Sequence, residues 1–176
     1  MPTGDAEDAA TVTVAVEIPK GSRNKYELDP ATGEIWLDRT LFTSMVFPAD
    51  YGFIEGTVGG DGDPLDALVF VGEPTFPGCR VRARPIGLFR MHDEKGPDEK
   101  ILCVPLRDPT WSDVRDLGDL NENLLNEIEH FFAVYKDLED KEVEVGGFGD
   151  QAEAIAVIAD AVERSPGASR PGIEGT

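Results

Sequence analysis

The sequence predicts an α+β fold, and three observations support this fold class. Residues 11–18 alternate strictly between apolar side chains and others, which is typical of a strand. Short extended segments separated by turn residues continue up to residue 104. Residues 119–135 and 150–162 instead repeat apolar residues with the period of a helix.

The length of the chain fits one domain. A chain of 176 residues can bury a sizeable core without disulfides. We expect this domain over residues 11–164, between a flexible acidic leader over residues 1–10 and a flexible tail over residues 165–176. The leader lacks a signal-peptide pattern, and no apolar run approaches the length of a membrane span, which predicts a cytoplasmic protein.

The charge balance narrows the possible partners. The chain has 16 basic and 35 acidic residues and a net charge of −19, which disfavours nucleic acids and anionic membranes. An anionic substrate therefore requires bound metals or a local basic cluster. Cys79 and Cys103 have no metal-ligand spacing, and in a reducing compartment they are expected as small buried side chains rather than a disulfide.

The first strand is followed by a predicted hairpin. Residues 25–28 resume an extended segment, residues 29–33 carry strong turn signals, and residues 34–39 form the returning strand. One face of the first strand is apolar, and the other carries Thr11, Thr13, Ala15 and Glu17. Glu17, at the end of that strand, is compatible with a solvated strand end as well as with a functional carboxylate.

Charged side chains on the hairpin also admit two interpretations. Lys25 and Glu27 share one face, so they either pair with each other or contribute to a site. Arg39 lies on the side of Ile35 and Leu37. A guanidinium on an apolar face either extends to the sheet edge or binds an anion.

An aromatic, turn-rich segment covers residues 47–53. Its proline and glycine exclude a helix interior. Tyr51 beside Gly52 indicates a hydroxyl held near a close approach of two backbones, although core packing explains the same residues equally well.

Residues 61–67, Asp-Gly-Asp-Pro-Leu-Asp-Ala, bring three carboxylates close together. At about 4 Å, like charges repel by roughly 1 kcal/mol in water and about 4 kcal/mol in a partly buried site. A cation relieves this repulsion, and oxygen ligands without His or Cys favour magnesium, manganese or calcium. An ordinary acidic turn explains these residues equally well. An EF-hand is excluded, because Pro64 falls inside the loop and Gly72 stands where its glutamate is required.

The middle of the chain continues with extended segments. Residues 67–71 predict a buried strand, and residues 78–91 an extended segment in which Pro85 and Gly87 imply a sheet edge or a bulge. A second acidic loop is expected over residues 93–100, before a short strand at residues 101–104. The two acidic loops each adjoin a strand, so they can meet at one end of a sheet or barrel.

The last part of the chain predicts two helices. Asp119 with Glu122, and Asp150 with Glu153, have the spacing of N-terminal capping boxes. The apolar face of the first helix comprises Leu124, Ile128, Phe131 and Tyr135, flanked by Leu125 and Phe132. That of the second comprises Ile155, Ile158, Ala159 and Val162. Lys136 follows the first helix, where a lysine also complements the helix dipole.

With these residues in view, the chain resembles a soluble family I inorganic pyrophosphatase of the bacterial type. Residues 61–67 match the aspartate signature of that family at each position. The resemblance extends over residues 12–164 through the motifs Glu17-Ile18-Pro19, Lys25-Tyr26-Glu27, Asp38-Arg39, Tyr51-Gly52-Phe53, Met91-x-Asp93-x-x-Gly96-x-Asp98-x-Lys100, His130-Phe131-Phe132 and Tyr135-Lys136-Asp137-Leu138-Glu139. It implies hydrolysis of pyrophosphate, a small closed β-barrel of the OB type with two main helices outside it, and a homohexamer.

The resemblance also implies a set of metal ligands. These are Glu17, Glu27, Asp61, Asp66, Asp93 and Asp98. By the resemblance, Asp66 bridges two metals, Asp98 serves both an activating metal and one that arrives with substrate, and Glu17 acts through water. The expected ion is Mg²⁺, several per site, with Mn²⁺ as a substitute and Ca²⁺ as an inhibitor.

The remaining site residues follow from the same resemblance. The phosphate-binding side chains are Lys25, Arg39, Tyr51, Lys100, Tyr135 and Lys136. Asp63 is the expected base toward the attacking water, with Asp98 as the alternative. Paired metals that activate water and neutralise phosphate charge suit this reaction. The two histidines and the absence of a nucleophile motif argue against a phosphoenzyme.

Phe47 departs from the family pattern, in which most members have a tyrosine. One supporting hydroxyl of the site is therefore expected to be missing. Two alternative functions, an OB-like module for single-stranded nucleic acid and a non-catalytic calcium-binding domain, fit less well. The negative charge opposes the first, and the retained basic residues are superfluous in the second.

Overall fold

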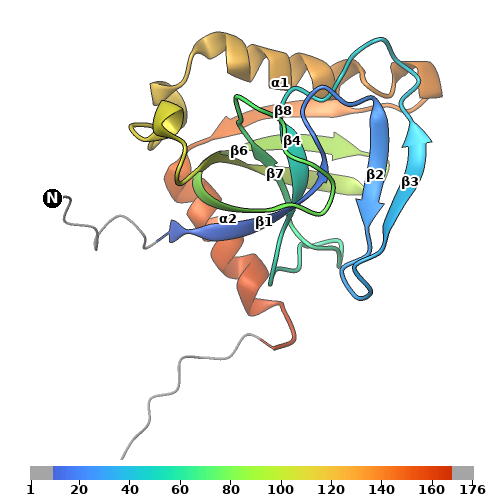
Figure 1. Cartoon of the computed structure of the whole chain (residues 1–176). Coiled ribbons are helices and arrows are strands. Elements are labelled where there is room, and N and C mark those ends of the chain that lie inside the picture. Colours follow the sequence, from blue (N-terminus) through green and yellow to red (C-terminus); the bar gives the residue numbers. More distant parts are fainter. Residues whose placement is uncertain (1–9, 168–176) are drawn as a thin grey trace, which may run out of the picture.

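The computed structural model describes residues 10–167 (Figure 1). The predicted leader and tail lie outside these residues, apart from residue 10 and residues 165–167. The strands are β1 (Val12–Ile18), β2 (Asn24–Leu28), β3 (Ile35–Thr40), β4 (Asp50–Ile54), β5 (Asp66–Val69), β6 (Arg80–Asp93), β7 (Gly96–Pro105) and β8 (Glu144–Gly149). The α-helices are α1 (Glu122–Val134) and α2 (Gln151–Glu163).

Five strands close into a ring. The main sheet has the order β1-β4-β5-β7-β6-β8, and β1 also pairs with β6, so β1, β4, β5, β7 and β6 form a closed circuit. Only β5 and β7 are parallel among these pairs. This ring confirms the expected small closed barrel. The hairpin of β2 and β3 stands beside it as a separate sheet.

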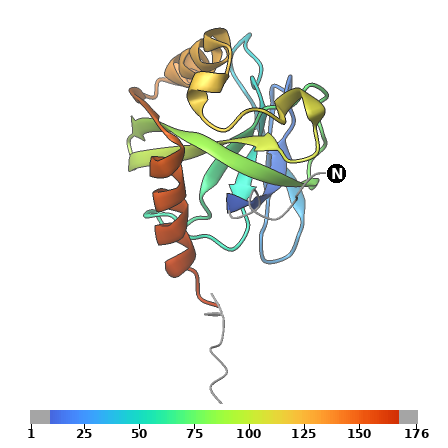
Figure 2. The same ribbon diagram turned by 90° about the vertical axis from the view of Figure 1, so that its left-hand side faces the viewer.

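Two helices lie outside the barrel. α1 lies across one end of the molecule and α2 runs along its side, as the two views in Figures 1 and 2 show. Each helix packs on its own cluster of buried residues: Phe131 and Phe132 of α1 pack with Leu68 and Leu102, whereas the alanines of α2 pack with Val69. Successive residues of β5 thus face different clusters, as the alternation of a strand requires.

Cys103 follows the prediction of a buried side chain, whereas Cys79 does so only in part. Cys103 is buried and Cys79 is half-buried, and both are free thiols. Burial raises the pKa of the Cys103 thiol far above its ordinary value, which makes it unreactive.

The second acidic loop was predicted too long. Asp93 of β6 pairs with Gly96 of β7, so only Glu94 and Lys95 form the turn, with Gly96 at a φ of 109°. Asp98 and Lys100 therefore lie within β7 and project to the same face. The acidic composition of residues 93–100 is typical of a loop. The pairing with β6, which makes residues 96–100 part of a strand, cannot be seen in that composition.

The proline and glycine of β6 mark a bulge rather than an edge. The register with β7 shifts between Pro85 and Gly87, while β6 also pairs with β1 and β8. The strand β8 was not predicted. Its glycines disfavour a strand, but Gly146 allows close contact with Arg90 of β6, where an added Cβ would lie 3.3 Å from the Arg90 carbonyl oxygen.

The first helix begins two residues later than Asp119 would require. Its N-cap is Asn121, whose side-chain oxygen accepts a hydrogen bond from Asn123 N–H at 2.9 Å. Asp119 instead ends a 3₁₀ turn, Leu117–Asp119, and accepts from the N–H groups of Arg115 and Asp116. Local capping spacing alone could not distinguish these two turns.

The capping box of α2 is confirmed, but its buried face is only partly the predicted one: Ile158 packs against the buried cluster, whereas the fully buried residues are alanines that were not predicted. Asp150 and Glu153 cap each other's backbone N–H groups. Ala154 and Ala161 are fully buried, whereas Ile155 and Val162 are each 39% exposed. The small alanines bring the helix close to the barrel, a feature that a search for large apolar residues misses.

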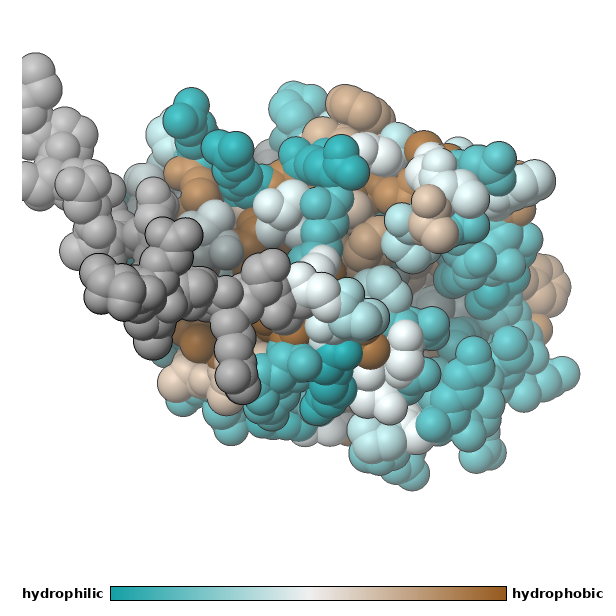
Figure 3. All heavy atoms as spheres, turned by 90° about the horizontal axis from the view of Figure 1, so that it is seen from below, coloured by the Kyte–Doolittle hydropathy of each residue, from teal (hydrophilic) through white to brown (hydrophobic). Residues whose placement is uncertain are grey.

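The predicted alternation of β1 needs a similar correction. Ala15, assigned to the polar face, is as buried as Val14 and Val16, because closure of the barrel covers both faces of the strand. Neither α1 nor α2, nor any other helix within residues 10–167, has the length and apolarity needed to cross a membrane. On the face shown in Figure 3, hydrophilic residues predominate and apolar ones are scattered among them.

Candidate active site

One cavity of about 570 Å³ gathers nearly all the predicted site residues. Its walls come from β1, β2, the loop between β4 and β5, the β6–β7 hairpin and the chain after α1. The predicted residues that line it are Glu17, Lys25, Glu27, Tyr51, Asp61, Asp63, Asp66, Asp93, Asp98, Lys100, Tyr135 and Lys136. Arg39 alone among the predictions does not line this cavity. The acidic segments thus converge, as expected.

Lys100 lies at the centre of the polar contacts. Its side chain is 3% exposed, and its Nζ donates to Tyr51 Oη at 2.9 Å and to Asp66 Oδ2 and Asp98 Oδ2 at 3.1 Å each. The ring of Phe132 lies 5.2 Å from the ammonium. Burial opposes the charged form, but the charge of Asp66, followed by Tyr51 and Asp98, raises the pKa of Lys100 above its ordinary value. Lys100 is therefore a fixed cation.

The barrel pairing explains why these groups meet. Asp98 and Lys100 share a face of β7, and Asp66 begins β5, the parallel neighbour of β7, at the position next to the Ala67–Ile101 pair. Burial raises the pKa of Asp98, an effect that the charge of Lys100 opposes and that of Asp66 reinforces. Two partly buried carboxylates therefore face one another across a lysine.

Tyr51 is positioned by a close approach of two strands. A Cβ on Gly52 would collide with the carbonyl oxygen of Ala15 in β1, so only glycine permits this pairing. Burial raises the pKa of Tyr51 well above its ordinary value. Tyr135, stacked on Phe131 with ring centroids 5.3 Å apart, has its pKa raised to about 12 by burial. Both phenols remain protonated hydrogen-bond donors at neutral pH.

Glu17 is a half-buried, hydrogen-bonded carboxylate rather than a solvated strand end. Its Oε2 accepts a hydrogen bond from Leu28 N–H at 2.8 Å, which ties β1 to β2. Burial raises the pKa of Glu17 to about 7, the Leu28 hydrogen bond opposes this rise, and the charge of Asp66 adds to it.

The aspartate loop between β4 and β5 is internally bonded. Gly59 N–H donates to the Asp63 carbonyl at 2.7 Å, and Asp63 N–H donates to Asp61 Oδ1 at 3.0 Å. Gly62, at a φ of 89°, provides the left-handed conformation at the turn. The Asp63 side chain is exposed toward the cavity.

The hairpin of β2 and β3 supplies the remaining charges. Lys25 Nζ contacts Glu27 Oε1 at 3.0 Å and Asp38 Oδ2 at 3.4 Å, so the pairing interpretation holds in this structure. Arg39 lies opposite Lys25 but is held outside the cavity by Glu139, through contacts of 2.7 and 3.1 Å, and by Asp38 at 2.8 Å. Sequence reasoning gave Asp38 and Glu139 no role, since Glu139 is 100 residues from its partner.

Asp93, the last residue of β6, and Lys136, which follows α1, face each other. Lys136 Nζ lies 3.9 Å from Asp93 Oδ2. Burial lowers the pKa of Lys136, while the charge of Asp93 opposes that change. Lys136 thus has a role beyond complementing the helix dipole.

Phe47 does not line the cavity. Its ring is 2% exposed and packs on Phe131 and Tyr51, with centroid distances of 4.8 and 5.5 Å. Phe47 therefore contacts a residue of the site, Tyr51, but does not itself border the cavity.

The cavity suits a hard divalent cation. Seven carboxylates and four lysines line it, and burial has already raised the pKa values of Glu17 and Asp98. An added cation would offset this excess of negative charge, and oxygen-only donors match Mg²⁺ or Mn²⁺. Within residues 10–167 no three acidic, histidine or cysteine side chains are already grouped closely enough to hold a metal ion.

Comparisons with known proteins agree with this chemistry. The model of the inorganic pyrophosphatase family matches residues 14–165. The inorganic pyrophosphatase of Corynebacterium efficiens is 55% identical over 155 residues, covering 88% of this chain and 98% of that protein. That of Streptomyces coelicolor is 57% identical over 152 residues, covering 86% and 93%.

Solved structures show the same similarity. The crystal structure of the inorganic pyrophosphatase from Thermus thermophilus has a TM-score of 0.86 and 42% identity, covering 93% of this chain and 95% of that one. The inorganic pyrophosphatase from Helicobacter pylori has a TM-score of 0.86 and 45% identity, covering 89% and 94%.

Proposed function

Since the chain belongs to the family I inorganic pyrophosphatases and therefore hydrolyses pyrophosphate to two orthophosphates, we propose that it does so with Mg²⁺ held by the carboxylates of the cavity. The observation that carries this proposal is the meeting of seven carboxylates and four lysines in one cavity. Residues 11–164 form the proposed pyrophosphatase domain, close to the matched range of 14–165.

The proposed ligands are the acidic residues that the resemblance implies. Asp61, Asp66 and Asp98 would hold activating Mg²⁺, Asp93 and Asp98 would hold the ion that accompanies substrate, and Glu17 and Glu27 would hold a further ion. When bound, Mg²⁺ neutralises phosphate charge and lowers the pKa of water.

The cationic and phenolic side chains bind the substrate. Lys25, Lys100 and Lys136 face the cavity and pair with phosphate oxygens by charge, while Tyr51 and Tyr135 donate hydrogen bonds as protonated phenols. The Arg39 guanidinium is hydrogen-bonded to Glu139. To bind a phosphate, it must either break these hydrogen bonds or donate to the phosphate and to Glu139 together.

Asp63 is the proposed base. Its carboxylate is exposed at the cavity and no ion pair is found for it within residues 10–167, so it is free to accept a proton from the attacking water. Asp98 remains the alternative, but Lys100 already donates to its oxygen. Because the water attacks phosphorus directly, no phosphoenzyme forms.

Orthophosphate release from pyrophosphate tests the proposed metal requirement. With millimolar Mg²⁺ at neutral pH the protein should release two phosphates per pyrophosphate, and EDTA should abolish the activity. Activity that persists after exhaustive chelation would overturn the role of Mg²⁺. Tight binding of calcium or single-stranded DNA without phosphate release would favour one of the alternative functions.

A cytoplasmic homohexamer is also proposed. Large apolar side chains are exposed on and near the hairpin: Ile35, Trp36, Leu37, Phe42 and Phe76. Surfaces of this kind are typical of subunit contacts. Light scattering should give six times the chain mass of 19.1 kDa, and a mass of one chain at micromolar concentration would contradict the hexamer.

A further inference from the structure

The aspartate loop has a rigid base. The Thr57 hydroxyl is buried, donates to the Ile54 carbonyl at 2.6 Å and accepts from Leu65 N–H at 3.1 Å. This bridge joins the two ends of the loop. Together with the bonds between Gly59, Asp61 and Asp63, it makes the loop one internally bonded unit.

This unit is attached to α2 at Val58. Val58 N–H donates to the Ala161 carbonyl at 2.9 Å, and Arg164 Nη1 donates to the Val58 carbonyl at 3.2 Å. Ala161 lies in the last turn of α2, where carbonyls lack partners within the helix. Arg164 is the C-cap, where a positive charge is favoured by the helix dipole.

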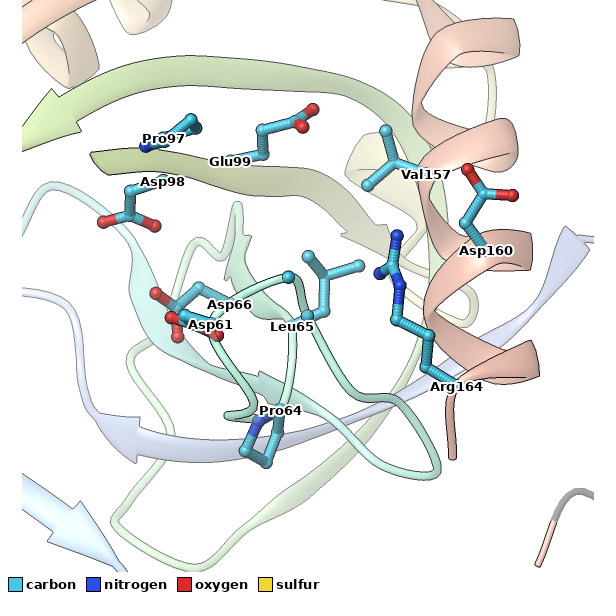
Figure 4. Close-up of a pocket in the computed structure, with 12 residues that line it drawn as sticks. Asp61, Pro64, Leu65, Asp66, Pro97, Asp98, Glu99, Val157, Asp160 and Arg164 are labelled. Carbon is cyan, nitrogen blue, oxygen red and sulfur yellow. The ribbon is translucent and has the colours of Figure 1, made fainter. Parts of the chain in front are cut away.

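Behind the loop lies a cavity of about 180 Å³, shown in Figure 4. Asp61, Asp66 and Asp98 lie at one side, while Asp160 and Arg164 extend from α2 at the other. Leu65, at the end of the loop, belongs to the same buried cluster as Ala154 and Ala161 of α2. The two hydrogen bonds at Val58 attach the beginning of the loop to the same helix, so they influence where the loop places its carboxylates.

We infer that Arg164 is a positioning residue that holds the aspartate loop against α2 in the arrangement from which its carboxylates bind metal. The inference rests on the proposed Mg²⁺-dependent function. It assigns to the end of α2 a part in metal affinity, although Arg164 does not line the larger cavity that holds the candidate catalytic groups.

Charge and positioning predict opposite effects. Arg164 lies in the same small cavity as three proposed metal ligands, so removal of its positive charge would by itself strengthen Mg²⁺ binding. Removal of its hydrogen bond makes the loop less ordered before binding. Mg²⁺ binding must then include the entropic cost of ordering the loop, which weakens the affinity for Mg²⁺. The sign of the change identifies the role.

The test compares Arg164→Gln and Arg164→Lys with the wild type and with Arg107→Gln, which removes an exposed arginine remote from the loop. Calorimetric Mg²⁺ titration without substrate should show about three- to tenfold weaker binding for Arg164→Gln, the factor expected for one hydrogen bond. Arg164→Lys should recover part of this loss. Arg107→Gln should bind Mg²⁺ as the wild type does.

A second measurement needs neither metal nor activity. Hydrogen exchange of the metal-free protein should be faster over residues 56–66 in Arg164→Gln and unchanged there in Arg107→Gln. Turnover of Arg164→Gln at saturating Mg²⁺ should stay within about twofold of the wild type, because a lost positioning contact acts before chemistry.

Two results would overturn the inference. One is Mg²⁺ binding by Arg164→Gln that equals or exceeds that of the wild type, and the other is unchanged exchange over residues 56–66. An inactive wild-type protein would instead refute the proposed function, and the exchange measurement would still decide whether Arg164 holds the loop. The two failures are thus distinguishable.

Discussion

The ammonium of Lys100 illustrates how a single residue sets the chemistry of this site. It is nearly inaccessible and donates to two carboxylates and one phenol. In this arrangement it compensates charges that would otherwise repel across a partly buried space. If Asp66 and Asp98 hold a cation, as proposed, the ammonium would be free to donate to a phosphate instead. Lys100 would then link metal binding to substrate binding.

Replacing Asp66 and Asp63, one at a time, with asparagine should separate the effect on metal binding from the effect on proton transfer. Asp66→Asn removes a charge beside Lys100 and should weaken Mg²⁺ binding by about tenfold or more, since roughly 1.4 kcal/mol of lost attraction is a factor of ten. Asp63→Asn should lower turnover by about a hundredfold or more, as loss of a general base does, with a smaller change in affinity. Calorimetry and steady-state kinetics measure both.

The control for this pair is the unfolding temperature, which should stay near that of the wild type for Asp63→Asn because its side chain is exposed. Equal losses of Mg²⁺ affinity in the two variants would remove the distinction between ligand and base.

Phe47→Tyr tests the position at which the chain departs from its family. The ring packs on Phe131 and Tyr51 and does not reach the cavity, so the new hydroxyl should change turnover by less than about threefold. Burying the hydroxyl without a partner should cost about 1 to 3 kcal/mol of stability. Kinetics and urea unfolding measure the two effects. A change in turnover of about a hundredfold with unaltered stability would place this residue in the site after all.

At the scale of elements, the bond between Arg39 and Glu139 joins the hairpin to the short 3₁₀ turn Asp137–Glu139 that follows α1. The hydrogen bonds from Arg39 lower the pKa of Glu139 below its ordinary value of 4.5. The carboxylate thus favours the folded state when ionised. This stabilisation is present above about pH 4.5 and is lost as the pH falls through the lowered pKa.

Glu139→Gln should therefore destabilise the protein by about 1 kcal/mol at pH 7, as expected for a forked pair on the surface. The difference from the wild type should shrink as the pH is lowered below about 4.5, the unshifted value. Urea unfolding in steps from pH 7 to pH 3 measures it. Glu127→Gln, an exposed change on α1, serves as control. A difference that grows toward acidic pH would show that the carboxylate is not stabilised by Arg39.

At the scale of the whole molecule, the fold concentrates negative charge on one cavity in a chain of net charge −19. Ions that bind only the folded state stabilise it by mass action. Mg²⁺ at about one hundred times its dissociation constant should add about 2.7 kcal/mol, which corresponds to about 5 to 10 °C in unfolding temperature for a chain of this size.

A melt in NaCl of equal ionic strength separates this effect from general screening of the acidic surface. NaCl should raise the unfolding temperature less than MgCl₂, and EDTA should reverse the additional rise. Equal shifts in the two salts would show that screening alone accounts for the stabilisation.

The sequence by itself determined the fold class, most strands and the capping box of α2. These follow from local patterns, such as the alternation in β1 and the turn residues between β2 and β3. The candidate site residues came from the resemblance to a family, and all of them except Arg39 line one cavity. Asp98 and Lys100 are two positions apart in the motif. On any strand, residues with this spacing project to the same face, so the sequence alone could place these two side chains together.

Only the tertiary structure decided how these elements meet. Closure of β1 onto β6 buried Ala15, and the barrel pairing extended β7 through the acidic segment after Gly96. Close docking of α2 buried Ala154 and Ala161 and left Ile155 and Val162 exposed. The Arg39–Glu139 bond spans 100 residues and the Arg164–Val58 bond spans 106. Such contacts depend on the packing of distant elements, for which a local pattern carries no information, because each side chain's partner is set by the closed barrel and not by its neighbours in sequence.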